Sequence, residues 1–477
     1  MAVHTKHPIA APPAAPPREK TRHLMLRAWC AFVLLQAFAG VAWVNAFGDV
    51  VAGTIAVVSG MVSAALWISI RPPVNWRRLP WFPLGYVAWA LTSIFWSSWQ
   101  STTAFTWLLL AITTLQGLMV ASMLGWKELI RAMAAALKWV IALSLLFELA
   151  VSVFIDGPLL PGFVIPTTKM DPIVYWSRNN LFDGGRIQGI FGNANLLASV
   201  ALTAMIVFAL IFAARTTRRV PLALWFTVAT YAFVRADSAT AYLSAAAVAV
   251  VLATALLMRT ARRPGSRTKY YAAFGAVGGL GIAVVWVWRD AIFAVLGRSS
   301  TLTGRETIWQ AVLERAIEHP VIGWGFATPW LSSDPAFDGW IIDHGQSVMQ
   351  AHNMWIDVFL QLGAVGLFIM AGIYLSVIWR AWFFAVDRPR WDLVANRPFS
   401  PLTLLPLLVM SMLLVQGLAE SGPLLLWGWL SVVMLGFKIK QAPLIGIGPA
   451  EQTLAMERGD GISSVTDGNG VAGNQRT

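Results

Sequence analysis

The sequence predicts an all-α membrane protein in which about twelve helices cross a bilayer. Two observations predict this fold class. Of the 477 residues, 57% are hydrophobic and only 12% are charged, whereas soluble domains carry about 25% charged residues. Apolar runs of membrane-crossing length also recur along the whole chain. These runs cover residues 28–47, 50–70, 81–99, 102–124, 130–155, 190–213, 220–235, 237–258, 270–288, 353–379, 401–418 and 423–437.

Polar segments flank this transmembrane domain of residues 28–437. Residues 1–27 are rich in Pro and Ala, and residues 438–477 are polar and rich in Gly, so both are expected to be disordered tails. The first apolar run resembles a signal-peptide core, but it is long and has no convincing cleavage site, which favours a first membrane helix. A single cysteine, Cys30, excludes an intrachain disulfide.

The distribution of positive charge predicts the orientation of the helices. If the N-terminus is cytoplasmic, the inner segments hold 26 of the 35 Lys and Arg residues and the outer segments hold eight. The remaining one, Lys138, lies inside an apolar run. Cytoplasmic loops of membrane proteins carry this excess, so both termini are expected in the cytoplasm. The net charge of +12 then reflects topology and not binding to nucleic acid.

Two long segments, 156–189 and 289–352, lie on the outer face in this topology, and long loops in compact proteins often carry function. The first ends in G-R-I-Q-G-I-F-G-N-A-N. Asn193 or Asn195 can cap the helix that follows, which is the plain structural explanation of these residues. Arg186 is less well explained, because the charge pattern disfavours an outer arginine. A guanidinium beside a helix start is suited to bind phosphate.

The second long segment begins with an amphipathic helix. Thr303 and Glu306 have the spacing of a capping box, and an apolar stripe at helical spacing follows until His319-Pro320. The stripe predicts an amphipathic surface helix, whose apolar side either packs against protein or anchors the helix at the membrane interface. Arg305 stands in the first turn, where the helix dipole disfavours a cation. This unfavourable position makes Arg305 a candidate functional residue.

His352 is the strongest catalytic candidate, at the outer start of an apolar run and next to Asn353. An imidazole can accept a proton from a hydroxyl near neutral pH, although a single interfacial histidine is more often inert. Carboxylates at or inside apolar runs are costly and need partners or a polar cavity. These carboxylates are Glu148, Asp237, Asp357 and Glu420. The sequence has no metal-binding motif, and we expect neither a metal nor another cofactor.

Four motifs in order resemble the O-antigen ligase and polymerase superfamily of bacterial envelope enzymes. They are W-S-S-W-Q (96–100), G-R-I-Q-G-I-F-G-N-A-N-L-L-A (185–198), G-R-E-T-I-W with H-P-V-I-G-W-G (304–309 and 319–325), and H-N with a downstream G-x-x-G (352–366). The resemblance extends over residues 28–437. It implies a GT-C-like membrane glycosyltransferase that is metal-independent and inverting. Such an enzyme of the bacterial cytoplasmic membrane takes a glycan from an undecaprenyl-pyrophosphate carrier on the outer face. It transfers the glycan to a hydroxyl of a glycan, lipid or protein acceptor.

The resemblance also implies roles for individual residues. Arg186 and Arg305 match the arginines that hold the donor pyrophosphate, and His352 matches the histidine that activates the acceptor. Many members carry a Ser-Arg-Thr-like element, but this chain has V-R-A-D-S-A-T-A with Ala239 in place of the arginine. Arg235, about one helical turn earlier, is the expected substitute. Supporting roles are expected for Asn193, Asn195, Asn353 and Glu420.

Two other functions remain open at this point. A transporter or lipid-linked glycan flippase could use the intramembrane carboxylates for ion coupling, but the sequence has no internal repeat and has large outer loops. A peptidoglycan-type polymerase would need different loop motifs. Within the favoured class, the sequence does not separate ligase, polymerase and protein glycosyltransferase.

Overall fold

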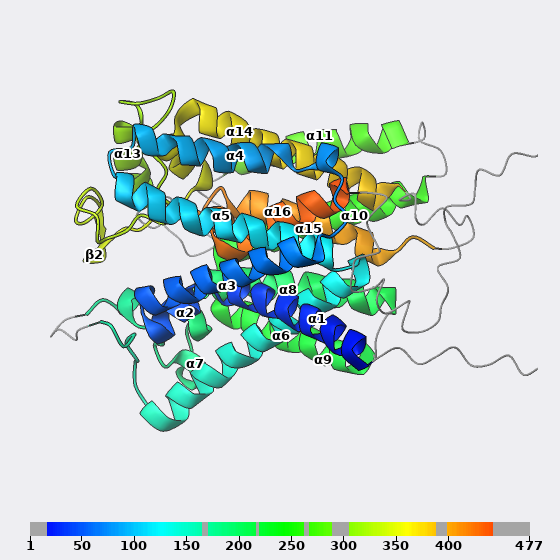
Figure 1. Ribbon diagram of the computed structural model, residues 1–477, viewed down its shortest axis with the longest axis horizontal. Helices are drawn as coiled ribbons and strands as arrows, with labels where there is room; N and C mark the ends of the chain where they lie inside the picture. Colours follow the sequence, from blue (N-terminus) through cyan, green and yellow to red (C-terminus); the bar gives the residue numbers. More distant parts are fainter. Residues whose placement is uncertain are drawn as a thin grey trace, which may run out of the picture.

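The computed structural model describes residues 17–164, 170–215, 219–261, 267–288, 305–387 and 398–441. These residues form a bundle of long helices (Figure 1). One end of the bundle carries α7, α13 and β2, and we call it the loop end. The predicted capping residue Thr303, and the predicted tails before Pro17 and after Gln441, lie outside the described residues.

The described residues contain the following α-helices and two very short strands, besides short 3₁₀ and π segments. They are α1 (Pro17–Ala39), α2 (Val41–Phe47), α3 (Asp49–Ile70), α4 (Trp81–Thr92), α5 (Gln100–Met123), α6 (Trp126–Ala150), α7 (Asn180–Asp183), α8 (Ala194–Ala214), α9 (Arg219–Ala236), α10 (Ala239–Thr260), α11 (Thr268–Val287), α13 (Arg305–Ala316), β1 (Ile342–Asp343), β2 (Gln346–Ser347), α14 (Met354–Val386), α15 (Leu405–Gln416) and α16 (Leu426–Lys440). β1 and β2 pair antiparallel.

The all-α membrane class that the sequence predicts agrees with this helical bundle. Within the described ranges, six helices are long and apolar enough to cross a bilayer, or seven if the bent pair α1–α2 is one span. The twelve spans predicted from the sequence exceed this number. Shorter apolar helices, such as 81–95 and 401–416, account for part of the difference, because the sequence counts them as full spans.

The first predicted span is not a single straight helix. α1 begins at Pro17, inside the segment expected to be a tail, and α1 and α2 meet at an angle of 80°. Gly40 sits at the bend with φ +28°, and a Cβ there would overlap the side chain of Leu426. Only glycine fits this combination of positive φ and close packing.

Small side chains allow the helices to pack closely, as expected in a bilayer, where apolar burial does not drive helices together. α8 is the most enclosed candidate span: 72% of its apolar window is buried, against 17% for α3. Its buried face includes Ala194, Ala198, Ala201 and Ala204. α5 and α16 approach each other at Gly117, where a Cβ would lie 3.2 Å from the carbonyl oxygen of Leu430.

Basic residues concentrate at the end of the bundle opposite the loop end, which we call the basic end. There Lys438 is buried, and its ammonium donates to the carbonyl oxygens of Ala121 and Leu124 at the C-terminus of α5. Arg259 donates to the Ala385 carbonyl at the end of α14 (2.7 Å). Cations in these positions satisfy the last carbonyls of a helix and its dipole.

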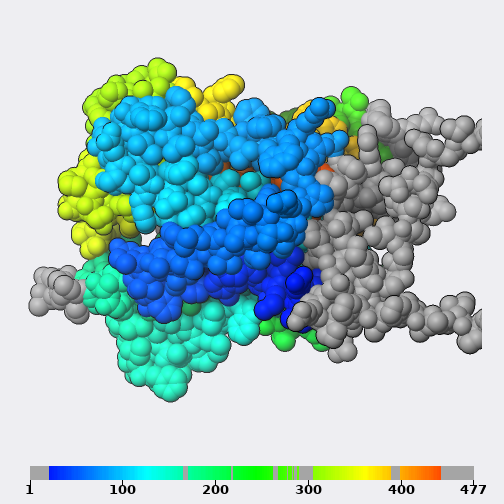
Figure 2. Space-filling view, viewed as in Figure 1, coloured from blue at the N-terminus to red at the C-terminus, as the bar shows by residue number. Residues whose placement is uncertain are grey.

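The loop end has its own small hydrophobic core, separate from the core between the long helices. Ile308, Val312 and Ala316 of α13 are buried in it against Trp330 and Phe337. The apolar stripe of α13 therefore packs against protein, which is the first of the two explanations that the sequence left open. Figure 2 shows this region (residues 305–350, yellow-green) and the segment near residues 155–190 (teal) at the same end of the molecule.

Arg315 organises the aromatic side chains of this core. Its guanidinium carbon lies 5.1, 5.1 and 4.6 Å from the ring centroids of Trp99, Trp324 and Trp340. Burial lowers the pKa of Arg315 from its usual value, while the charges of Glu318 and Asp334 oppose this effect. Cation–π contacts of this kind replace part of the lost hydration. They fix the segment that precedes His352.

Candidate active site

His352 and Glu420 lie at the centre of a polar cluster at the loop end. His352 Nδ1 is 3.1 Å from Glu420 Oε2. His352 has a left-handed backbone (φ +51°), which turns the chain just before α14. The Asn353 side chain then caps α14 by accepting from the Trp355 and Ile356 amides, and its Nδ2 donates to the Leu418 carbonyl (3.0 Å).

Arg305 approaches the same carboxylate from α13. Its Nη2 donates to Glu420 Oε1 at 2.6 Å, and its Nη1 donates to the Ala419 carbonyl at 2.6 Å. The Glu420 side chain is 9% exposed and that of Arg305 is 17% exposed, so this ion pair is shielded from water. The unfavourable position of Arg305 in the first turn of α13 is thus offset by a direct anionic partner.

Arg186 joins the cluster through an asparagine. Its Nη2 donates to Asn195 Oδ1 (2.8 Å), and Asn195 Nδ2 donates to Glu420 Oε1 (2.9 Å). The Ser238 hydroxyl also donates to Asn195 Oδ1 (2.9 Å). Glu420, in the segment after α15, therefore contacts side chains of α8, of α13 and of the segment before α14. Through Asn195 it is also linked to Arg186, in the segment before α8.

The loop that carries Arg186 is held by a buried carboxylate. Glu148 Oε1 accepts the backbone N–H groups of Gln188 (2.8 Å) and Gly189 (2.7 Å), and its Oε2 accepts the Ser177 hydroxyl (2.7 Å). The sequence predicts that Glu148 needs a partner or a polar cavity, and two loop amides and one loop hydroxyl are its partners. Asn193 caps α8 by accepting from the Asn195 and Leu196 amides, as its position predicts.

Arg235 takes a different place from the one expected of a substitute for the missing arginine. Its Nη2 donates to the carbonyls of Asn180 (2.7 Å) and Leu181 (3.1 Å), and its own carbonyl accepts the Ile187 amide. These contacts connect the end of α9 to both sides of the loop that carries Arg186. The reason is geometric: α9 ends at Ala236, so Arg235 meets the backbone of this loop.

Charge and hydrogen bonding keep Glu420 ionised. Burial would raise the pKa of its carboxyl, but the hydrogen bond and charge of His352 and the adjacent Arg305 guanidinium outweigh that effect. The pKa of Glu420 therefore lies below its usual value of 4.5. An ionised carboxylate accepting from Nδ1 fixes the histidine tautomer and leaves Nε2 as the basic ring atom.

A second carboxylate, Asp357 on α14, holds both neighbours of the His352–Glu420 pair. Its Oδ2 accepts the Ala351 amide (3.1 Å) and the Ser421 hydroxyl. Asp357 is 1% exposed. From the sequence, Asp357 was one of four unexplained carboxylates, because a one-dimensional pattern does not show that residues 351 and 421 meet in space.

The other histidines of the second long segment lie away from Glu420. The His319 ring packs edge-on against Trp324, with centroids 4.2 Å apart. His344 is 55% exposed and lies 3.1 Å from Asp171, whose pKa is lowered by a backbone hydrogen bond from Ile173 and by His344. Both histidines belong to the loop scaffold.

Comparison with known proteins shows a similarity to one family over part of the chain. A family model described as O-Antigen ligase matches residues 224–371. This match supports the family that the motifs predict, O-antigen ligases and polymerases. The exopolysaccharide production protein ExoQ of Rhizobium meliloti (strain 1021) is similar, with 28% identity over 155 residues, 31% of this chain. The aligned segment spans only about a third of that relative, 35% of its length.

The O-antigen ligase match covers one part of the polar cluster. Arg305, His352 and Asn353 fall within residues 224–371, whereas Arg186, Asn195 and Glu420 lie outside them. The structure connects the two groups through the hydrogen bonds of Asn195 and Glu420. The chain is thus an integral membrane protein that is similar to the O-antigen ligase family over residues 224–371 and has a connected polar cluster at its loop end.

Proposed function

We propose that this protein transfers a glycan from an undecaprenyl-pyrophosphate-linked donor to an acceptor hydroxyl, at the outer face of the bacterial cytoplasmic membrane. The observation that carries the proposal is the Glu420 carboxylate, bonded at once to His352, Arg305 and Asn195. Such a cluster combines a base with fixed positive charge, which is what displacement of a pyrophosphate requires.

In the proposed reaction, His352 is the general base. The acceptor hydroxyl gives its proton to Nε2 while its oxygen attacks the anomeric carbon of the donor sugar. The bond from that carbon to the pyrophosphate oxygen breaks, and undecaprenyl pyrophosphate leaves with the electron pair. Glu420 stabilises the imidazolium through Nδ1. A single displacement of this kind inverts the anomeric configuration and needs no metal.

Arg186 and Arg305 are the proposed pyrophosphate ligands. Guanidinium groups stay charged and bind phosphate oxygens bidentately, and both approach Glu420 from the loop end. For Arg235, the contacts with Asn180 and Leu181 favour a positioning role: it holds the loop of Arg186 in place. Asn193 and Asn353 support the site as helix caps, and Asn195 couples Arg186 to Glu420.

The finer topology is part of the same proposal. Twelve spans in a GT-C-like arrangement, with both termini cytoplasmic, would put the basic end inside and the Glu420 cluster outside. The concentration of Lys438 and Arg259 at the basic end supports this orientation. This orientation is tested with cysteines introduced at Ser98 and Arg78, which flank α4 (81–92) on opposite sides. A cysteine at position 98 should be labelled from outside the cell, and one at position 78 only after lysis.

A transporter or flippase remains the alternative function. It would use buried carboxylates to couple to ions, but Glu148 is hydrogen-bonded to two amides and one hydroxyl. These three donors indicate a structural role for Glu148.

Whether the protein is a polymerase or a ligase is tested by analysing lipid-linked glycans in a deletion strain. Single repeat units accumulate if the protein is a polymerase, and long carrier-linked chains accumulate if it is a ligase.

A further inference from the structure

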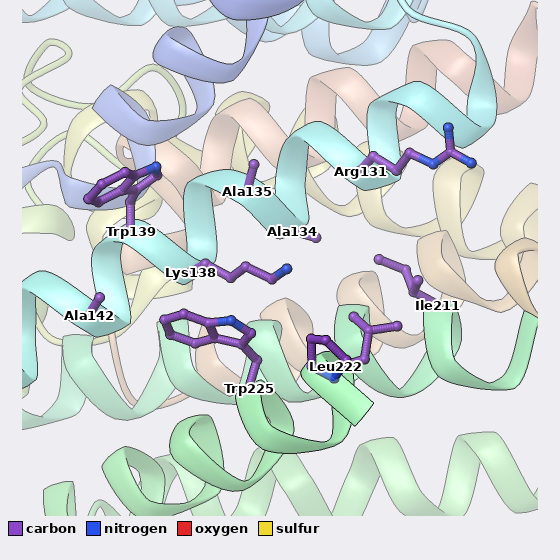
Figure 3. A pocket seen from close by; sticks show the side chains of 10 residues that line it. Arg131, Ala134, Ala135, Lys138, Trp139, Ala142, Ile211, Leu222 and Trp225 are labelled. Carbon is purple, nitrogen blue, oxygen red and sulfur yellow. The ribbon is translucent and has the colours of Figure 1, made fainter. Parts of the chain in front are cut away.

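A cavity of about 580 Å³ that shares no residue with the Glu420 cluster lies between α6, the end of α8 and the start of α9 (Figure 3). Its walls are mostly apolar. The lining residues are Arg131, Ala134, Ala135, Lys138, Trp139, Ala142, Ile211, Pro221, Leu222 and Trp225. The volume is in the range of small-molecule and lipid sites. Nothing in the proposed glycan transfer uses this cavity.

Two cations on one side of α6 make the lining of this cavity positively charged, and we call the cavity the groove from here on. Arg131 and Lys138 are seven residues apart, so their backbones differ by about 10 Å along the helix axis. In Figure 3 the Lys138 side chain lies above Trp225 and extends along α6 toward the end that carries Arg131. Within the described part of the chain, neither side chain makes a hydrogen bond or an ion pair.

A cation inside an apolar helix is costly unless an anion or water compensates it. Glu128, which lines the neighbouring smaller cavity, already faces Arg27 (3.6 Å) and His23 (3.8 Å). A smaller cavity of about 280 Å³, which Arg27 also lines, adjoins the first one and shares Arg131 and Ala135 with it. The groove therefore carries surplus positive charge next to apolar walls.

We propose that this groove binds an anionic diacyl phospholipid, with its phosphate at Arg131 and Lys138 and an acyl chain along Trp225 and Leu222. Trp139, which is 61% exposed, faces outward from the bundle at the same groove, so an acyl chain can enter sideways from the bilayer. Basic pockets between membrane helices on the cytoplasmic side bind such headgroups. The inference does not rest on glycan transfer; only the choice of the inner leaflet rests on the proposed orientation.

Native mass spectrometry of the full chain in neutral detergent tests this site. The probes are phosphatidylglycerol and phosphatidylcholine with identical acyl chains. The test variant combines Arg131→Gln and Lys138→Met. The matched control is Lys127→Gln, which removes an exposed cation of the same helix outside the groove. Wild type and control should retain phosphatidylglycerol in preference to phosphatidylcholine. The double variant should bind phosphatidylglycerol about fivefold more weakly for each charge removed.

Equal retention of phosphatidylglycerol by wild type and the double variant would overturn the proposal. So would equal binding of the two lipids to wild type, or a loss in the control as large as in the double variant. Displacement of phosphatidylglycerol by an equimolar polyprenyl phosphate would assign the groove to another lipid class and also overturn it. If the double variant does not remain folded, Lys138→Gln alone, with an unchanged melting temperature, gives the same comparison.

Discussion

His352 Nδ1 lies 3.1 Å from Glu420 Oε2, although 68 residues separate them in the chain. The Glu420 carboxylate binds Arg305 with its other oxygen at 2.6 Å. A histidine held in this way by an ionised carboxylate has a fixed tautomer and a basic Nε2. A single interfacial histidine is weak evidence for catalysis, but this contact with Glu420 makes His352 a candidate general base.

Replacing His352 with alanine should lower glycan transfer by about 10²- to 10⁴-fold, the usual contribution of a general base. The measurement is the initial rate with purified protein and lipid-linked donor. His344→Ala is the matched control, because His344 is exposed in the same loop segment and should leave the rate unchanged. A His352→Ala protein that keeps most of the wild-type rate would contradict the role of His352.

Glu420→Gln should remove a pH-dependent part of the stability. The folded-state pKa of Glu420 lies below its usual value of 4.5, so the unfolded chain takes up this proton first as pH falls. The stabilisation is therefore present above about pH 4.5 and is lost as pH drops through the lower folded-state value. The melting temperature should fall less steeply with acid in Glu420→Gln than in wild type. Parallel curves for the two proteins would contradict the ion pairing of Glu420.

Arg186→Lys and Arg305→Lys keep the charge but lose the planar pair of donors that binds phosphate bidentately. We expect kcat/KM for the lipid-linked donor to fall about tenfold or more in each, which corresponds to one lost charged hydrogen bond. Arg178→Lys is the control, because Arg178 donates to the Pro172 carbonyl in the same loop. Unchanged kinetics in both variants would exclude pyrophosphate binding by these arginines.

Asp357→Asn should destabilise the protein by about 1–3 kcal/mol, because the buried carboxylate accepts from Ala351 and Ser421. Thermal unfolding in detergent measures this loss. Since these neighbours flank His352 and Glu420, the pH profile of kcat/KM should shift as well. Tyr374→Phe on the same helix is the control, as its hydroxyl has no partner among the described residues. A pH profile that does not shift would limit Asp357 to a structural role.

The helical membrane class follows from composition and apolar runs, which depend on local sequence alone. The turn at 235–237 between two helices is also where the sequence predicts it, since α9 ends at Ala236 and α10 begins at Ala239. The bend at Gly40 was not predicted, because it depends on contact with Leu426. Two predicted spans, 81–99 and 401–418, are longer than the helices α4 (Trp81–Thr92) and α15 (Leu405–Gln416), because hydropathy does not report where tertiary packing ends a helix.

The site was predicted as separate residues and not as a network. Helix-capping rules account for Asn193 and Asn353, because a cap acts within a few residues. The pairing of Glu420 with His352 and Arg305 joins segments up to 115 residues apart, and no local pattern carries that information. Arg235 shows the same limit: its distance along the helix suggested a substitute arginine, but its carbonyl partners at Asn180 and Leu181 became visible only in three dimensions.

The central claim is tested most directly by incubating the purified protein in liposomes with a labelled undecaprenyl-pyrophosphate-linked oligosaccharide and an acceptor glycan or lipid. We predict that wild type and His344→Ala release undecaprenyl pyrophosphate and form a larger or acceptor-linked glycan, and that His352→Ala does neither. Movement of intact donor across the bilayer, with no release of undecaprenyl pyrophosphate by wild type, would contradict the account and favour a flippase.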